Sequence, residues 1–214
     1  MRQKPCDTSR RAPDRDGFHM IPRASHGAGA YISTHGCLIF NTLGGTGKVL
    51  FTMPIAMYPG SFDPVTRGHL DIIKRSSRMF DKLIVAVLVN SAKTPLFTVE
   101  ERVAMLRECC KDMPNVEVDS FNGLTVSFAK QKNATVMVRG LRAVTDFENE
   151  IQLAHTNYAM MPEIETVFLA TAIKWSYLSS TIVREAAHYG QDVSRFVPPN
   201  VEKELLAKRQ AGEL

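Results

Sequence analysis

Short hydrophobic runs recur along the chain from residue 54 onward, and longer stretches of mixed polarity separate them. The runs have the length of single strands, and several are continuous, as expected for strands covered on both faces of a sheet. They predict five strands, over Ile55–Tyr58, Leu83–Val89, Val116–Phe121, Thr135–Val138 and Glu165–Ala170.

The stretches between these runs repeat apolar residues at helical spacing. They predict helices over His69–Phe80, Val99–Asp112, Leu124–Lys132, Asp146–Met160, Ser180–Tyr189 and Val201–Lys208. Thr98, with Glu101 three residues later, predicts a capping box at the start of the second helix. Strands that alternate with helices predict an α/β fold, a doubly wound, Rossmann-like parallel five-stranded sheet with helices on both faces. Ligands of such sheets bind beyond the carboxyl ends of the strands.

Residues 1–52 do not follow this pattern. They contain seven of the 13 glycines, together with scattered arginines and prolines, and show no sustained periodicity. Such a composition is typical of poorly ordered segments. We therefore expect a disordered or non-native N-terminal extension over 1–52 and one folded domain over 53–214. The first twenty residues also lack the apolar stretch of a signal peptide.

Charge and cysteine content narrow the class of protein. The net charge of +4 comes entirely from residues 1–52, because residues 53–214 contain 19 basic and 19 acidic side chains. A neutral body does not favour nucleic-acid binding. No apolar run approaches the roughly 20 residues that would cross a bilayer. Cys109 and Cys110 are adjacent in a predicted helix, which indicates reduced thiols and a cytoplasmic location.

The segment from Pro54 to His69 carries the first chemical signal. It predicts a strand, a turn at Gly60 and then the start of a helix. Backbone N–H groups and the helix dipole favour anions at such a place. Ser61 offers a hydroxyl there, and His69 can donate a hydrogen bond to a phosphate. The segment is therefore typical of an enzyme that handles nucleotides.

Two further clusters of polar side chains lie at the end of a predicted strand and at the start of a predicted helix. Arg139 and Arg142 flank Gly140 after the fourth strand, and two guanidinium groups so placed suit phosphate oxygens. The hydroxyls of Ser179–Thr181, with Arg184 one turn later, favour a triphosphate clamp over simple helix capping. Lys93, just past the second strand, is a candidate phosphate contact. Such a site suits nucleotidyl transfer by positioning and charge stabilisation.

These motifs together resemble one family, the bacterial phosphopantetheine adenylyltransferases of the nucleotidyltransferase superfamily. The resemblance rests on Tyr-Pro-Gly-Ser-Phe-Asp-Pro followed by Thr-x-Gly-His, on Arg-Gly-Leu-Arg followed by Asp-Phe-Glu, and on Ser-Ser-Thr-x-x-Arg. It covers residues 53–214. It implies that ATP and 4′-phosphopantetheine react to give dephospho-coenzyme A and pyrophosphate in coenzyme A biosynthesis. It also implies Mg²⁺ and a cytoplasmic homohexamer.

The resemblance assigns roles to individual residues. His69 would contact ATP and stabilise the transition state. The ATP site would consist of Ser61, Phe62, His69, Gly140, Leu141, Arg142, Glu150, Trp175, Ser176, Tyr177, Leu178, Ser179, Ser180 and Thr181. Phosphopantetheine would contact Ser61, Lys93, Thr125 and Arg139. Asn149 departs from the family, where a tyrosine is common.

Other functions share parts of this pattern. A related enzyme could use another phosphorylated acceptor, such as nicotinamide mononucleotide or glycerol phosphate. A class I aminoacyl-tRNA synthetase uses similar histidine chemistry, but this chain has no room for a tRNA-binding domain. A non-catalytic nucleotide sensor would keep the cavity and lose turnover.

Overall fold

The computed structural model describes residues 19–20, 29–32, 37–42, 45–50, 54–89 and 94–214. The chain divides into two compact units, Met1–Thr52 and Met53–Leu214. The boundary lies where the hydrophobic pattern begins along the sequence. Each unit is described below by itself.

The first unit contains an antiparallel four-stranded sheet in the order β1-β2-β3-β4. Its strands are β1 His19–Met20, β2 Gly29–Ile32, β3 Cys37–Thr42 and β4 Gly45–Leu50. Poor order was expected over residues 1–52 from their composition, and that expectation stays a prediction. Cys37–Phe40 is a short apolar run of the kind that favours strands, and it pairs with β4 over its whole length. The interpretation of this unit as a non-native extension stays a prediction.

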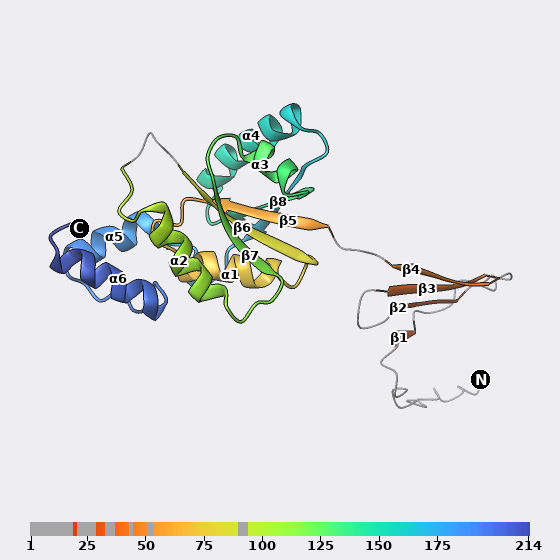
Figure 1. Cartoon of the computed structure of the whole chain (residues 1–214), viewed down its shortest axis with the longest axis horizontal. Helices are drawn as coiled ribbons and strands as arrows, with labels where there is room; N and C mark the ends of the chain where they lie inside the picture. The colour runs from red at the N-terminus through yellow and green to blue at the C-terminus, as the bar shows by residue number, and fades with distance from the viewer. Residues whose placement is uncertain (1–18, 21–28, 33–36, 43–44, 51–53, 90–93) are drawn as a thin grey trace, which may run out of the picture. The chain divides into compact units, whose positions relative to one another are not determined.

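The second unit is built on a parallel sheet in the order β7-β6-β5-β8-β9 (Figure 1). Its strands are β5 Ile55–Gly60, β6 Lys82–Leu88, β7 Val116–Phe121, β8 Val136–Leu141 and β9 Glu165–Ala170. The predicted doubly wound sheet is confirmed. The chain passes from β5 outward to β7 and then returns to β8 on the other side of β5. A crevice for ligands is expected at this reversal, beyond the carboxyl ends of β5 and β8.

Six α-helices follow the strands in the described part of this unit, as predicted. They are α1 Arg67–Ser76, α2 Val99–Cys110, α3 Thr125–Gln131, α4 Val144–Met160, α5 Ser180–His188 and α6 Pro199–Gln210. The short 3₁₀-helix η1, Ile173–Trp175, was not expected. The predicted capping box of Thr98 and Glu101 is present at α2. No helix in the described part of the chain is long and apolar enough to cross a membrane.

Helices cover both faces of this sheet (Figure 1). Side chains along a strand alternate between the faces, so Ala56 and Tyr58 join a core with α1, α2, α5 and α6. Met57, between them, joins a second core with Val126 and Ala129 of α3. The candidate site lies at the carboxyl ends of β5 and β8.

Candidate active site

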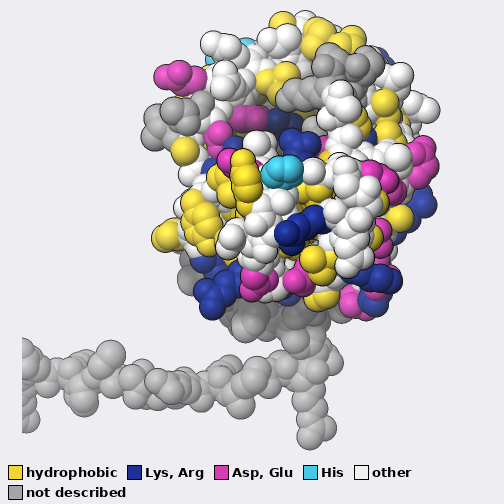
Figure 2. Space-filling view, turned by 90° about the vertical axis from the view of Figure 1, so that its left-hand side faces the viewer, with side chains coloured by type: hydrophobic (Ala, Val, Ile, Leu, Met, Phe, Trp, Pro, Cys, Tyr) yellow, Lys and Arg dark blue, Asp and Glu magenta, His cyan; other side chains and the backbone are white. Residues whose placement is uncertain are grey.

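A cavity of about 580 Å³ lies at the carboxyl ends of β5 and β8. The turn after β5, the end of β8 and the N-termini of α1 and α5 all contribute to its walls. On the face drawn in Figure 2, Lys and Arg side chains and histidine gather at a hollow. The crevice therefore occurs where the strand order predicts it.

The turn after β5 is shaped by an aromatic ring. Phe62 is only 2% exposed, and its ring packs edge-on against Tyr58 and His69 at centroid distances of 5.5 and 5.1 Å. A Cβ added at Gly60 would lie 3.0 Å from this ring. The absence of a side chain at Gly60 thus makes room for the Phe62 ring.

His69 is held by the first turn of its own helix. Thr66 is the N-cap of α1, and its hydroxyl accepts from the His69 N–H at 3.3 Å. The Thr66 backbone N–H in turn donates to His69 Nδ1 at 3.1 Å. This reciprocal pair is a capping box with histidine at the third helical position, and it explains why α1 begins at Arg67 rather than at the predicted His69. Because Nδ1 accepts a hydrogen bond, the ring proton is carried by Nε2.

The surroundings of His69 keep its ring neutral at physiological pH. Burial lowers the pKa of His69 from 6.5 to about 4, and the nearby positive charge of Arg142 acts in the same direction. A neutral imidazole with a proton on Nε2 can donate one hydrogen bond into the cavity. It does not add a full positive charge to the site.

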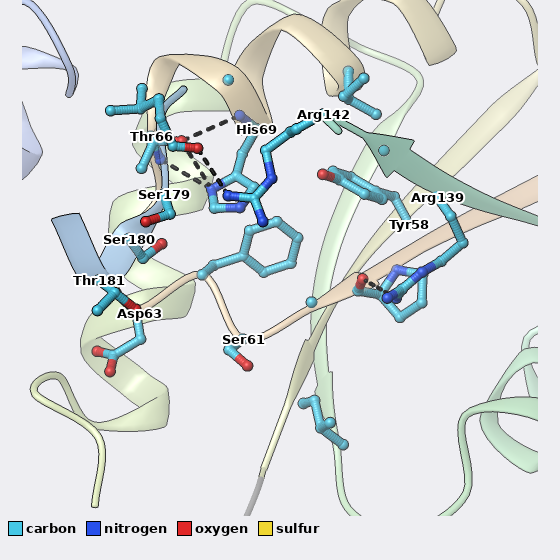
Figure 3. A pocket seen from close by; sticks show the side chains of 18 of the residues that line it. Tyr58, Ser61, Asp63, Thr66, His69, Arg139, Arg142, Ser179, Ser180 and Thr181 are labelled. Atoms are coloured by element: carbon cyan, nitrogen blue, oxygen red, sulfur yellow. Dashed lines mark hydrogen bonds between the residues drawn. The ribbon is translucent and has the colours of Figure 1, made fainter. Parts of the chain in front are cut away.

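Two arginines lie on opposite sides of the cavity (Figure 3). Arg139 makes a two-pronged ion pair with Glu150, at 2.5 and 2.6 Å, and also donates to the Pro59 carbonyl. Arg142 lies beside His69 and pairs with Asp146, at 3.0 and 3.2 Å. Carboxylates thus hold both guanidinium groups in place at the cavity wall.

The hydroxyl cluster lies at the start of α5, on the same side as His69 (Figure 3). Ser179 caps the helix by accepting from the Ile182 N–H at 3.1 Å. Ser180 donates to the Pro64 carbonyl at 2.7 Å, which ties α5 to the turn after β5. The N-termini of α1 and α5 both border the cavity, so their dipoles favour an anion inside it.

Most predicted site residues line this cavity. They are Ser61, Phe62, His69, Thr125, Arg139, Gly140, Arg142, Glu150, Trp175, Leu178, Ser179, Ser180 and Thr181. Three predicted ATP contacts do not line it: Leu141, Ser176 and Tyr177. The Ser176 hydroxyl donates to the Ile173 carbonyl, and Tyr177 is exposed with its ring edge-on to Phe196. Lys93 lies outside the described residues.

Three further side chains with charged or polar groups line the cavity but were not predicted as site residues. Tyr58 ends the apolar run of β5, and burial raises the pKa of its phenol. Asp63 accepts from the Leu96 and Phe97 N–H groups and pairs with Arg184 at 2.9 Å. Arg102 is buried in α2. Its burial could have been inferred from the sequence, because Arg102 lies four residues before Leu106 and so shares the apolar stripe of that helix.

The acidic side chains at this site do not form a metal centre. Among the described residues, no group of three His, Cys, Asp or Glu side chains could hold a metal ion. The carboxylates that line the cavity, Asp63 and Glu150, are each bound by a guanidinium group. Their oxygens therefore do not supply a resident Mg²⁺ site.

Comparison with known proteins agrees with this geometry. The family model for cytidylyltransferase-like proteins matches residues 57–186. A phosphopantetheine adenylyltransferase from Lachnoclostridium phytofermentans is 58% identical over 156 residues, which cover 73% of this chain and 96% of that protein. The chain belongs to the phosphopantetheine adenylyltransferase family. A member of this family from Synechocystis is also 58% identical, over 72% of this chain and 96% of its own length.

A solved structure supports the fold of this phosphopantetheine adenylyltransferase family member. Nicotinic acid mononucleotide adenylyltransferase from Plasmodium falciparum is similar with a TM-score of 0.53 and 14% sequence identity. The match covers 72% of this chain and 94% of that structure. At this identity the likeness concerns the fold alone.

Proposed function

We propose that this protein transfers the adenylyl group of ATP to 4′-phosphopantetheine, giving dephospho-coenzyme A and pyrophosphate in coenzyme A biosynthesis. The observation that carries the proposal is the neutral His69, set in one cavity between helix N-termini on one side and Arg139 on the other. This arrangement suits two phosphorylated substrates that meet near one hydrogen-bond donor. The identity of the acceptor substrate is inferred from the names of the relatives, which are phosphopantetheine adenylyltransferases.

The reaction is an in-line displacement at phosphorus. A phosphate oxygen of 4′-phosphopantetheine attacks the α-phosphorus of ATP and forms the new P–O bond. The bond from the α-phosphorus to the oxygen that bridges it to the β-phosphorus breaks, and pyrophosphate leaves with that electron pair. The acceptor is a phosphate monoester with a second pKa near 6, so it is largely dianionic at neutral pH and needs no general base.

His69 acts on charge that develops during this step. Its Nε2–H donates to an α-phosphate oxygen, where negative charge grows in the transition state. The capping box holds the ring, so little reorganisation accompanies the reaction. Since the imidazole is neutral, His69 serves as a hydrogen-bond donor and not as an acid.

The two sides of the cavity bind different substrates. The α5 N-terminus, with Ser179–Thr181, and Arg142 hold the β- and γ-phosphates of ATP. Arg139 and Thr125, on the other side, bind the phosphate end of phosphopantetheine. Ser61, in the turn between the sides, contacts both substrates. The assignment of Lys93 to the acceptor phosphate rests on its sequence position alone.

Mg²⁺ enters this proposal as part of the substrate. ATP brings the ion on its phosphate oxygens, which is the usual way Mg²⁺ reaches phosphoryl-transfer sites. No step above is routed through the metal.

The test is a pyrophosphate-release assay on the full chain with ATP, Mg²⁺ and one acceptor at a time. We expect turnover with 4′-phosphopantetheine and none with nicotinamide mononucleotide or glycerol 3-phosphate. Turnover with one of the other acceptors alone would replace the proposed substrate. Tight ATP binding without pyrophosphate release from any acceptor would identify a nucleotide sensor.

We further propose that the enzyme is a cytoplasmic homohexamer. Helix α4 leaves Phe147, Tyr158 and Met160 between 41% and 51% exposed, and such apolar side chains support self-association. Light scattering after size-exclusion chromatography should give six times the chain mass of 23.8 kDa. A monomer mass would contradict the assembly, and recovery of the protein in a membrane or extracellular fraction would contradict the location.

A further inference from the structure

One buried charged side chain at the cavity has no part in the mechanism above. Arg102 is 3% exposed and shares the apolar stripe of α2 with Leu106 and Cys110. A charge is costly to bury unless polar groups surround it. The position of Arg102 therefore has to be explained by what its guanidinium group contacts.

The guanidinium group binds carbonyl oxygens from three segments. Its Nη1 donates to the Ser61 carbonyl at 2.8 Å and to the Leu88 carbonyl at 3.3 Å. Its Nε donates to the Thr98 carbonyl at 3.2 Å. These oxygens belong to the turn after β5, to the end of β6 and to the N-cap of α2. A planar guanidinium reaches all three, whereas a lysine ammonium is a single compact charge.

The turn that Arg102 holds has an uncommon backbone conformation. Phe62 has a φ of +48°, in the left-handed region that a phenylalanine rarely adopts. Such a conformation persists only where the surrounding structure restrains it. Arg102 restrains the residue before Phe62, through the Ser61 carbonyl. Asp63 restrains the residue after it, by accepting from the Leu96 and Phe97 N–H groups at 3.0 and 2.9 Å.

The hydrogen bond to the Ser61 carbonyl also orients the next amide. A trans peptide is planar, so the N–H of Phe62 points opposite to the C=O of Ser61. The N–H of Phe62 makes no hydrogen bond to any residue within 54–89 or 94–214. Both Ser61 and Phe62 line the cavity. The direction of the Ser61 carbonyl thus determines the direction in which the Phe62 N–H can donate to a phosphate.

We propose that Arg102 is a positioning residue for adenylyl transfer. By binding the Ser61 carbonyl, it fixes the Ser61–Phe62 peptide and so places the Ser61 hydroxyl and the Phe62 amide against the reacting phosphates. The inference rests on the proposed function. It adds a residue whose part in the reaction is to hold the turn.

The experiment compares Arg102→Lys and Arg102→Ala with the wild type, in the full chain. For each protein, kcat, both KM values and the melting temperature are measured. In Arg102→Lys we expect kcat to fall at least about tenfold, with each KM within about threefold, because the lost positioning matters most in the transition state. In Arg102→Ala, guanidinium chloride at tens of millimolar should restore part of kcat, and sodium chloride should not.

Arg107→Ala is the matched control. Arg107 lies on the same helix and also donates to a carbonyl, that of Val118, but it does not line the active-site cavity. Its kcat should equal that of the wild type.

Several results would overturn the proposal. These are a wild-type kcat in both Arg102 variants, a rise in KM at constant kcat, or a loss of activity that Arg107→Ala shares. Unfolding of both variants at assay temperature would make Arg102 a stability residue and would also overturn it. An inactive wild type would instead refute the proposed function, so the two failures are distinguishable.

Discussion

At the scale of single residues, the site depends on how neighbouring groups set the state of one imidazole. Backbone and hydroxyl groups of Thr66 occupy Nδ1, and burial beside Arg142 lowers the pKa of the ring. The same surroundings therefore decide which nitrogen carries the proton and whether the ring is charged. A histidine in the same place on an exposed helix would be partly protonated near pH 6.5.

Removal of the imidazole should affect the chemical step. His69→Ala is expected to lower kcat by about 10²–10³-fold, the usual cost of losing one donor to a developing oxyanion. The dissociation constant of ATP should stay within about tenfold, because the α5 N-terminus and Arg142 remain. Steady-state kinetics give the first quantity. The fluorescence of Trp175, the only tryptophan and part of the cavity wall, follows ATP binding for the second. A kcat close to that of the wild type would remove His69 from the mechanism.

The low pKa of His69 has a consequence for stability. Its pKa is about 4 in the folded protein and near 6.5 in the unfolded chain, so between these values the unfolded chain binds more protons. His69 should therefore lower the free energy of unfolding as the pH falls from about 6.5 through 4. His69→Gln removes this titration but keeps a side chain that can complete a capping box. Chemical denaturation from pH 7 to pH 4 should show a steeper loss in the wild type. Parallel curves would contradict the low pKa.

At the scale of secondary-structure elements, the site depends on the positions of helix N-termini. α1 and α2 both begin with a threonine N-cap and a capping box, but only that of α1 contains the proposed catalytic side chain. The β-strands set the place, since β5 and β8 are the strands at which the sheet order reverses. Helix starts then supply the N–H groups and dipoles that favour phosphates.

The two capping boxes allow a matched comparison. Thr66→Ala and Thr98→Ala should each lower the free energy of unfolding by about 1 kcal/mol, because each removes one N-cap hydroxyl. Only Thr66→Ala should also lower kcat, by about tenfold, since it loosens the His69 ring. Denaturant unfolding and steady-state kinetics on both variants check this. Equal kcat values in the two variants would show that the cap of α1 has no role beyond helix stability.

Periodicity predicted these elements well because their pattern is local. The five parallel strands and six helices described in the second unit lie close to their predicted ranges, although α1 ends at Ser76 and not at the predicted Phe80. The same method missed Arg102 and Tyr58, because their roles depend on which segments the fold brings beside them. The family resemblance, and not periodicity, placed Ser176 and Tyr177 in the ATP site. In the structure the Ser176 hydroxyl donates to the Ile173 carbonyl, and the Tyr177 ring lies edge-on to Phe196.

At the scale of the whole molecule, the described residues that line the cavity all belong to Met53–Leu214. The described residues of the two cores belong to the same unit. The match to the cytidylyltransferase-like family also falls within this unit. The described strands of the first unit form their own sheet, in the order β1-β2-β3-β4.

The fragment 53–214 should therefore fold and work alone. We expect one cooperative thermal transition and a kcat within about twofold of the full chain, because the described residues of the cores and of the cavity all lie within this fragment. Calorimetry and the pyrophosphate assay on both proteins provide the measurements. A fragment that aggregates, or one that folds with a much lower kcat, would show that residues 1–52 contribute to the second unit.

The ion pairs around the cavity determine what a substrate must do to bind. Arg139, Arg142 and Arg184 already have the carboxylates of Glu150, Asp146 and Asp63 as partners. A phosphate that took over these donors would replace a carboxylate that is already bound, and its binding would be an exchange of counter-ions. Because the carboxylate pairs with the arginine again when the product leaves, such an exchange lowers the free-energy cost of product release. It also lowers the free energy gained when the substrate binds. A site organised in this way favours passage of nucleotides over their retention.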